Sequence, residues 1–412
     1  MVAQQTGKHN LLIMWFANFF VAGSMTMVMP FLSLYIDSFG DFSDQYVQKW
    51  AGITFGVTFV TALLFSPIIG RMGDKYGRKK IMIFMGIGMS LSLFSLGFAT
   101  SVWELFILRM LMGFFSGFIP VSQAFISTQT PKETAGKVLG TLQTGSVTGA
   151  LFGPMIGGVL ADSIGYAATF QSTSSFILLS AILVFTVKEY RIGISGKTKK
   201  SFSRKEVWRH ILKNPILLNV MLMTALVQVA HFSIQPILSL YVAELHGLEN
   251  IALFSGLAFS AAGLGNLLMT RKWGTLADQI GYVKILIFLL ILSAIIYLPG
   301  AFVTNIWQLI TIRFILGLAI GGIIPVQVAY IRQEAPVEMQ GEVLGYNTSL
   351  RFLGNIVGPL LGGFLSGWYG ISSVFFVTSA LLLLSGLLLI GTVHRHPKFV
   401  KEKRNLVQER QA

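Results

Sequence analysis

The sequence predicts an all-α membrane protein, with twelve transmembrane helices arranged in two pseudo-symmetric six-helix bundles. Three observations predict this fold class: a shortage of charge, a series of long apolar runs and an internal repeat. Of the 412 residues, 53% are hydrophobic and only 12% are charged, and the mean hydropathy is +0.69. Soluble domains carry about 25% charged residues, so this composition predicts a surface that faces the lipid bilayer.

Twelve apolar runs are long enough to cross a bilayer, which takes roughly 20 residues as a helix. The sequence lacks the short alternating segments that are typical of a membrane β-barrel. The expected spans are 10–36, 50–70, 81–100, 103–129, 137–160, 168–188, 215–243, 251–271, 284–302, 306–332, 341–366 and 371–392.

The loops between these spans fall into two sets of opposite charge, which we name the basic side and the acidic side. The basic side holds Arg71, Lys75, Arg78, Lys79, Lys80, Lys132, Lys137, Arg271, Lys272, Lys284, the whole 188–213 linker and the C-terminal tail. The acidic side holds Asp37, Asp41, Asp44, Glu104, Asp162, Glu244 and Glu249 against one lysine, Lys49. The positive-inside rule therefore predicts a multi-pass protein of the cell membrane with cytoplasmic termini. It also explains the net charge of +14 without a nucleic-acid partner.

A basic linker divides the chain into two halves of six spans each. The expected parts are an N-terminal bundle (1–188), a cytoplasmic linker (189–214), a C-terminal bundle (215–392) and a cytoplasmic tail (393–412). Within the linker, Val207, Trp208, Ile211 and Leu212 share one helical face. This pattern fits a short helix lying on the anionic inner leaflet, or a solvated linker with one hydrophobic turn.

The two halves repeat each other at an offset of 204–206 residues. Pro30-Phe-Leu-Ser-Leu-Tyr35 recurs as Pro236-Ile-Leu-Ser-Leu-Tyr241. Trp103, Arg109 and Gly113 recur as Trp307, Arg313 and Gly317, and Gly153, Pro154, Gly157 and Gly158 recur as Gly358, Pro359, Gly362 and Gly363. Because six is an even number, both copies have the same orientation. Such parallel repeats place a substrate site between the halves near the membrane midplane, and rocking of the halves gives alternating access.

A short basic loop at 70–80 carries the most specific motif of the chain. Its sequence is Gly-Arg-Met-Gly-Asp-Lys-Tyr-Gly-Arg-Lys-Lys. A weaker copy follows 204 residues later, in which Gly274, Asp278, Gly281 and Lys284 match Gly70, Asp74, Gly77 and Lys80. The second copy keeps the aspartate and loses most of the basic residues.

Taken together, these motifs resemble the major facilitator superfamily, in particular its twelve-span drug/proton antiporter group and the multidrug efflux pumps of Gram-positive bacteria. The resemblance rests on the 70–80 loop, on Arg109 with Gly113 in the fourth span, and on the fifth-span motif of Gly149, Gly153, Pro154, Gly157 and Gly158. It implies export of hydrophobic or amphipathic drugs by alternating access, with a proton gradient as the energy source and a monomer as the working unit.

In the resembled family, contacts of the 70–80 loop latch the halves together on the cytoplasmic side. The latch residues here are Gly70, Gly73, Asp74, Gly77 and Arg78. Asp74 can pair with Arg78, or lie at the N-terminus of a helix of the other half. The alternative is a plain topology signal from the basic residues.

The fifth-span glycines recur every four residues and therefore share one helical face, which lets helices pack backbone to backbone. We expect this face to lie where the halves meet, and the same device to recur at Gly358 and Pro359. The alternative is a tight packing seam without a role in transport.

Three arginines lie within predicted spans: Arg109, Arg313 and Arg351. Buried arginines are costly and face cavities or partners; the alternative is a structural arginine whose donors are satisfied by backbone carbonyls. For Arg109 the resemblance implies a role in proton coupling. No span centre contains an acid, so the candidate proton carriers are Asp37, Glu104 and His231. For His231 the alternative is a hydrogen-bonded packing residue, which is the commoner role of a lone histidine in a span.

The expected substrate cavity draws on spans that line it in the resembled family. Aromatic rings and neutral amides suit flat amphipathic ligands. The candidates are Asn18, Phe19, Gln123, Gln143, Gln228, Phe232, Gln235, Gln327, Tyr346, Asn347 and Arg351. Buried arginine without acid favours zwitterionic, neutral or anionic substrates over simple cations.

Several other functions remain to be weighed against proton-coupled drug efflux. A lipid or glycolipid flippase, or a sugar or metabolite exporter, would use the same fold. A membrane sensor would be expected to carry a large soluble domain. An enzyme is not expected, because no span carries a paired acid and base or a metal-ligand cluster. No phosphate-binding loop and no cysteine occur in the sequence, so no cofactor or metal is expected.

Overall fold

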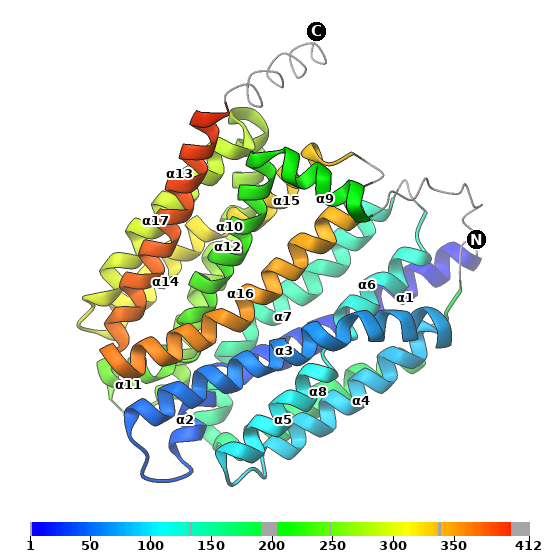
Figure 1. Ribbon diagram of the computed structural model, residues 1–412. Helices are drawn as coiled ribbons and strands as arrows, with labels where there is room; N and C mark the ends of the chain where they lie inside the picture. Colours follow the sequence, from blue (N-terminus) through cyan, green and yellow to red (C-terminus); the bar gives the residue numbers. More distant parts are fainter. Residues whose placement is uncertain (1, 132–133, 191–203, 248, 337–338, 397–412) are drawn as a thin grey trace.

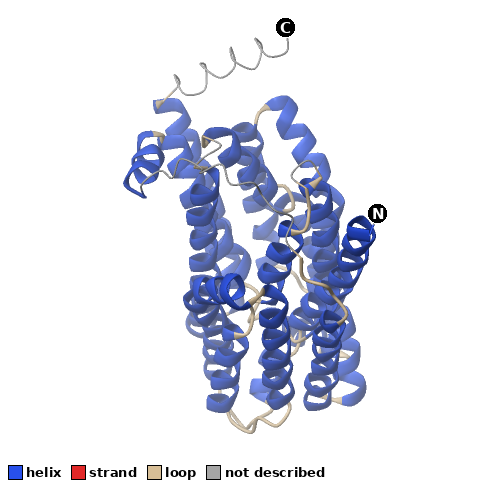
Figure 2. Ribbon diagram, turned by 90° about the vertical axis from the view of Figure 1, so that its right-hand side faces the viewer, coloured by secondary structure: helices blue, strands red, loops and turns tan. Residues whose placement is uncertain are grey.

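The computed structural model describes residues 2–131, 134–190, 204–247, 249–336 and 339–396. Within these ranges the regular structure is helical and contains no strand (Figure 2). The first half contains α1 (Val2–Met27), α2 (Leu32–Asp37), α3 (Asp44–Tyr76), α4 (Arg78–Leu96), α5 (Val102–Phe114), α6 (Phe118–Thr128), α7 (Ala135–Ile164) and α8 (Tyr166–Phe185).

The second half repeats this order after the linker helix α9 (Arg204–Lys213). It contains α10 (Pro215–Ser233), α11 (Leu238–His246), α12 (Ile251–Ile280), α13 (Tyr282–Tyr297), the 3-10 turn η1 (Leu298–Ala301), α14 (Ile306–Ile320), α15 (Ile323–Glu334), α16 (Gln340–Tyr369) and α17 (Ile371–Arg395).

Eleven helical segments of the described chain are long and apolar enough to cross a membrane. The twelfth expected span is α16, which has 30 residues but carries Glu342, Asn347, Arg351 and Asn355. These polar side chains lower its hydropathy, and α16 packs against α3 and α10 (Figure 1). Large apolar side chains such as Leu64, Leu91 and Phe185 are exposed on the outside of the bundle, as a lipid-facing surface requires.

Four spans are interrupted at positions that the repeat relates. The breaks separate α1 from α2 and α10 from α11, beside Pro30 and Pro236. They also separate α5 from α6 and α14 from α15, just before Pro120 and Pro325. Proline lacks the N–H that a helix interior needs, so each helix pair changes direction there. Interrupted spans in corresponding positions are a mark of repeat-built transporters.

Residues that the repeat relates make equivalent contacts in the structure. Ser33 of α2 and Ser239 of α11 are repeat mates, and their hydroxyl oxygens lie 2.9 Å apart. A residue meets its own mate only at a two-fold axis. The hydroxyl of Tyr35 donates to the Leu96 and Ala99 carbonyls at 3.0 Å, and its mate Tyr241 donates to the Gly300 carbonyl at 3.0 Å.

The two halves meet along two equivalent pairs of helices, α3 with α16 and α7 with α12. In the first pair the Cα of Gly52 faces the carbonyl of Pro359; in the second, Gly256 faces the carbonyl of Pro154. A Cβ at either glycine would overlap that carbonyl, so only glycine permits this approach. Figure 1 shows α3 and α16 running side by side along this contact.

The linker helix α9 packs against the second half. Val207 and Ile211 are buried, the Trp208 ring contacts the Tyr346 ring of α16 in a tilted arrangement with centroids 4.8 Å apart, and Leu212 is exposed. Of the four residues on the expected apolar face, only Val207 and Ile211 are therefore buried in protein, because α9 packs there against α10 and α16.

Candidate functional site

A cavity of about 200 Å³ lies between the two halves, close to the breaks in the interrupted spans. It is lined by 15 residues, and none of them is acidic. The expected residues in the lining are Pro154, His231, Phe232, Gln235 and Arg313. The remaining ones are Thr26, Met29, Ala150, Phe259, Ala262, Gly263, Asn266, Leu316, Gly317 and Ile320.

Arg313 of α14 is the cation of this cavity, and its side chain is only 2% exposed. Its Nε donates to the Ala258 carbonyl at 3.3 Å, and its guanidinium lies over the Phe259 ring, 6.0 Å from the centroid. Its Nη1 has no hydrogen-bond partner in the described chain. The guanidinium is therefore held in place on one side, while its charge meets no carboxylate among the lining residues.

Arg109 of α5 has the same setting in the first half but a different neighbourhood. Its Nε donates to the Thr54 carbonyl at 3.3 Å, and its guanidinium lies over Phe55 at 5.5 Å, both repeat mates of the Arg313 partners. Its Nη1 donates to the Met112 sulfur at 3.5 Å. Arg109 does not line the central cavity. On sequence alone, these arginines could either face a cavity or be structural. The contacts of Arg109 fit the structural alternative better than the contacts of Arg313 do.

His231 lies in the last turn of α10, Gln235 follows four residues later in the turn that leads to α11, and both line the cavity. The Nε2 atoms of the two side chains are 3.5 Å apart. His231 Nδ1 and Gln235 Oε1 have no hydrogen-bond partner in the described chain, and Gln235 is only 7% exposed. Buried polar atoms are normally paired, so these atoms, with Arg313 Nη1, are candidate contact points for a polar ligand in the cavity.

Most other residues expected in the cavity lie outside it and contact side chains of neighbouring helices instead. The amides and aromatics of this set form local contacts: Ser122 donates to Asn18 at 2.8 Å, Gln123 to Gln143 at 3.1 Å and Gln228 to Asn355 at 2.9 Å, while Phe19 stacks on Trp15 at 5.8 Å. Thr224 donates to Asn347 at 2.7 Å and accepts from Gln327, while the Tyr346 ring contacts the Trp208 ring at a tilt. Neither these residues nor Arg351 line the central cavity.

The glycine face of α7 packs within the first half, contrary to the expectation that it lies where the halves meet. Gly149, Gly153 and Gly157 face the backbone of α1, at Phe19, Gly23 and Met27. The neighbouring face, with Pro154 and Gly158, meets α12 of the other half. A helix turns about 100° per residue, so the adjacent Gly157 and Gly158 face different helices, and only one of them can face the other half. Gly358 and Pro359 of α16 divide in the same way between α10 and α3.

On the acidic side a carboxylate joins the halves. Asp162, near the end of α7, accepts from the backbone N–H groups of Ala252 at 3.2 Å and Leu253 at 2.7 Å, in the first turn of α12. A carboxylate at a helix N-terminus satisfies unpaired donors and complements the helix dipole.

The two other acids singled out on this side have local roles. Glu104 accepts from the Thr100 N–H at 2.8 Å and donates its own N–H to Ser101 Oγ at 3.3 Å, which caps α5. Asp37 is exposed at the end of α2; burial of its carboxyl, and then the nearby Asp44 charge, raise the pKa of Asp37. The hydrogen bonds and ring contact of Arg109 do not involve either acid.

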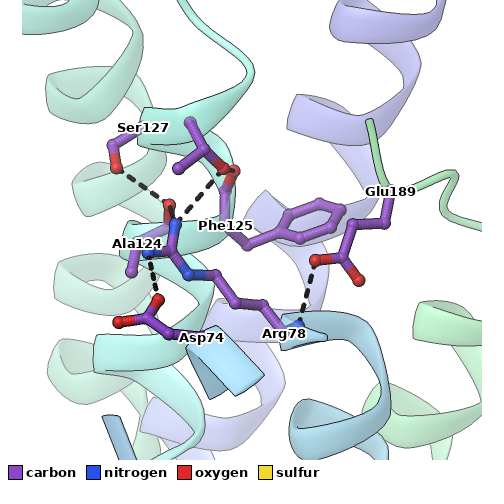
Figure 3. A network of polar contacts seen from close by, with 7 residues as sticks. Asp74, Arg78, Ala124, Phe125, Ser127 and Glu189 are labelled. Carbon is purple, nitrogen blue, oxygen red and sulfur yellow. Dashed lines mark hydrogen bonds and ion pairs between the residues drawn. The ribbon is translucent and has the colours of Figure 1, made fainter. Parts of the chain in front are cut away.

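On the basic side, the 70–80 segment, expected from the sequence as a loop, is helical except at Gly77, because α3 continues to Tyr76 and α4 begins at Arg78. Figure 3 shows the Asp74–Arg78 pair and the contacts of Arg78 with α6 of the same half. Asp74 pairs with Arg78 at 2.8 Å, and Arg78 also donates to the Ala124 carbonyl and, at 3.2 Å, to Thr128 of α6. Gly77 adopts φ +95°, a conformation that favours glycine, and there the chain turns from α3 into α4. Gly70 and Gly73 border a cavity of about 190 Å³ beside this pair.

The second copy of the loop keeps this geometry with different chemistry. Gly281 turns the chain at φ +108°, as Gly77 does. Asp278 accepts a hydrogen bond from Tyr282, and these are the repeat mates of Asp74 and Arg78. The tyrosine replaces the charge of the arginine by a neutral donor, so the two loops are alike in shape and unlike in charge.

Three functional residues escaped the sequence analysis. Asn266 lines the cavity, Asp162 caps α12, and Glu189 accepts from the N–H groups of Arg78 at 3.0 Å and Lys79 at 3.2 Å, at the start of α4. Asn266 carries a signal, as an amide in an otherwise apolar stretch of span. Asp162 and Glu189 have no local signal, because their partners lie 90 or more residues away.

Comparisons with known proteins agree with this architecture. A family model described as Major Facilitator Superfamily matches residues 14–271 and 252–411. The chain is 53% identical over 369 residues to a Bacillus subtilis (strain 168) protein named as the uncharacterized MFS-type transporter YuxJ, covering 89% of this chain and 94% of that one. It is 38% identical over 383 residues to the multidrug resistance protein MdtG of Salmonella typhi, covering 92% and 94%.

Among solved structures, a bacterial homologue of the human lysosomal transporter Spinster, in an inward-facing and unoccupied conformation, superposes with a TM-score of 0.76 at 16% identity, covering 96% of this chain and 98% of that one. That likeness concerns the fold alone. With its twelve-span, two-fold repeated architecture and these matches over most of its length, the chain is a multi-pass membrane protein that belongs to the major facilitator superfamily of transporters.

Proposed function

We propose that this protein is a proton-driven exporter of hydrophobic or amphipathic drugs, with its basic side in the cytoplasm. The observation that carries the proposal is the cavity between the halves, where aromatic walls surround a few unpaired polar groups. Such a lining suits chemically varied amphipathic ligands. The MdtG relatives, which are named multidrug resistance proteins, support the same class of cargo.

The conformation of the helices supports alternating access as the mechanism. The halves are packed together toward the acidic side, where Gly158 meets Ala252 and Asp162 caps α12. Toward the basic side, Gly140 of α7 and Gly274 of α12 have open space where a Cβ would point. With the basic side cytoplasmic, this is the state that takes up cargo from the cell.

For the coupled proton, the geometry favours His231 among the expected carriers. His231 lines the cavity with an unpartnered Nδ1, whereas the Glu104 carboxylate caps a helix. We expect protonation of His231 and binding of cargo to compete for one cavity, with Arg109 as a structural support of α5. A His231→Ala variant should then bind cargo but lose acceleration by a pH gradient.

The test is transport by purified protein in liposomes, with a fluorescent fluoroquinolone as the cargo and an imposed pH gradient. Movement that requires the gradient and stops with a protonophore is the expected result. The His231→Ala variant serves as the coupling control. Movement of the dye that is equal with and without the gradient would contradict proton coupling, and movement of a labelled lipid instead of the dye would contradict drug export.

The orientation has its own test. The chain has no cysteine, so Arg71→Cys supplies a unique label in the 70–80 loop. In intact cells a membrane-impermeant maleimide should leave this cysteine unlabelled, and it should react after the cells are opened. Labelling in intact cells would place the basic side outside.

A further inference from the structure

We propose that Arg313 anchors an anionic group of the cargo, so that the central cavity selects amphipathic organic acids and zwitterions over cations. The proposal rests on the export function above and deepens it by naming the substrate class. It begins from an imbalance of charge: the cavity contains one permanent cation and no acidic lining residue.

The imbalance is costly in the place where it occurs. A charge deep in a membrane protein is stable only with a partner or with water. Arg313 is 2% exposed; its hydrogen bond goes to the Ala258 carbonyl and its ring contact to Phe259, both uncharged. The buried Tyr297 is also an electrostatic neighbour of Arg313, and its hydroxyl has no hydrogen-bond partner in the described chain. A guanidinium has five N–H donors in a fork that matches a carboxylate or phosphate. An arriving oxyanion would supply both the missing charge and the missing acceptor.

The repeat allows Arg313 to be compared with its mate Arg109 in the same protein. Arg109 has the same carbonyl and ring contacts, so these two contacts are what the fold needs to hold an arginine here. Arg109 adds a bond to the Met112 sulfur and does not line the cavity. Arg313 adds no such bond and does line it. The difference between the two mates is therefore the access of Arg313 to a ligand.

A second buried group points to the same ligand. Gln235, 7% exposed, lines the cavity from the turn between α10 and α11 of the same half, and its Oε1 has no hydrogen-bond partner in the described chain. Its amide can turn to present the NH₂ donor to an acid or the carbonyl to a ligand N–H. Phe232 and Phe259 supply apolar walls beside these groups. The cavity of about 200 Å³ is smaller than a whole drug-sized site, so it accommodates the charged end of an amphipath and its first ring.

The experiment measures equilibrium binding without any gradient, to full-length protein in detergent. The probes are radiolabelled 2-naphthylacetate and its neutral counterpart of equal shape, 2-naphthylacetamide, with 2-naphthylethylamine as the cation. Wild type is expected to bind the acid at least about tenfold more tightly than the amide, the range that a charged hydrogen-bonded pair contributes, and the amine more weakly than the amide. Equal binding of acid and amide by wild type, or preference for the amine, would overturn the proposal.

Variants then assign the preference to Arg313. Arg313→Gln should bring the acid-to-amide ratio close to one while amide binding is retained, and Arg313→Lys should keep part of the preference. Retained amide binding also shows that the cavity is still folded. Arg271→Gln, which removes an exposed arginine near the basic end of α12, is the control and should leave the ratio unchanged. A preference that survives in Arg313→Gln would overturn the assignment, and so would a preference lost equally in Arg271→Gln. If Arg313→Gln does not fold, the wild-type ratio and Arg313→Lys decide.

The anionic group could come from a soluble organic acid or from a lipid head group. A further binding measurement distinguishes these two sources. Binding of 2-naphthylacetate is repeated in nanodiscs of phosphatidylcholine with and without phosphatidylglycerol. Unchanged binding assigns the site to soluble acids, whereas displacement by phosphatidylglycerol that depends on Arg313 assigns it to lipid. Displacement that also occurs in Arg313→Gln would overturn the site. Because no gradient is used, a failure of proton-driven transport leaves this result standing, and the reverse also holds.

Discussion

Adjacent glycines in α7 have separate tasks at the scale of single residues. Gly157 faces the Met27 carbonyl of α1 within one half, and Gly158 faces the Ala252 carbonyl of α12 in the other half. A methyl group added at either position would overlap a backbone atom, and overpacking of this kind costs about 1–3 kcal/mol. Under the alternating-access mechanism proposed above, the contact within one half would persist in every conformation and the contact between the halves would not, so we expect the two costs to fall on different equilibria.

We therefore predict that Gly157→Ala lowers the thermal stability of the protein in every conformation. Gly158→Ala should instead favour the state in which the acidic side is open, by roughly five- to a hundredfold for the same energy. Thermal unfolding in detergent measures the first effect, and reactivity of a cysteine placed in the α7–α12 contact measures the second. Equal loss of stability in both variants would show that the two glycines act alike.

The Asp74–Arg78 pair gives a second residue-scale prediction. The side chain of Asp74 is 66% exposed, so its ion pair is screened and contributes about 0–1 kcal/mol to this conformation. We expect Asp74→Asn to leave membrane insertion and thermal stability almost unchanged while transport falls several-fold, because the carboxylate acts when the basic side closes. Arg78→Lys, which keeps the charge, is the matched variant. Unchanged transport by Asp74→Asn would contradict the latch.

At the scale of elements, the hydrogen bonds between Asp162 and the first turn of α12 join the two halves on the acidic side, and we propose that they act as a latch. A carboxylate at a helix N-terminus contributes about 0.3–1 kcal/mol, and here the carboxylate and the helix belong to different halves. We predict that Asp162→Ala shifts the population toward the acidic-side-open state by about two- to fivefold, and that Asp162→Asn, which keeps an acceptor, shifts it less. Accessibility of an introduced cysteine on the acidic side is the measurement, and no shift in either variant would rule out the latch.

Elements also show where sequence reasoning succeeds and where it stops. The offset of the repeat predicts which residues are mates, and the contacts confirm it at Arg109 and Arg313, because both halves were built from one pattern. Most residues expected in the cavity lie outside it, because their amides bind polar side chains of neighbouring helices: Asn347 accepts from Thr224, and Gln123 donates to Gln143. Spacing along a span tells which residues share a face, but the rotation of that face depends on partners far away in the sequence.

At the scale of the whole molecule, the two halves should move as rigid bodies about the two-fold axis near Ser33 and Ser239. Rocking requires that the ends of α7 and α12 change separation in opposite directions on the two sides. The absence of cysteine makes this measurable with introduced spin labels. One pair is Ser163→Cys with Glu249→Cys on the acidic side, and the other is Gly140→Cys with Gly274→Cys on the basic side, where the glycines have open space.

We predict that conditions which open the acidic side lengthen the Ser163–Glu249 distance and shorten the Gly140–Gly274 distance together. Pulsed electron paramagnetic resonance in nanodiscs, at pH 5 and pH 8 and with each label pair in wild type and Asp162→Ala backgrounds, provides the distances. The Asp162→Ala background should show the same two populations in a different ratio, because a latch changes the balance between states and leaves the states themselves intact. Distances that lengthen or shorten in parallel on both sides would mean that the bundles deform instead of rocking, and the glycine contacts of α3 with α16 and of α7 with α12 would then be fixed seams.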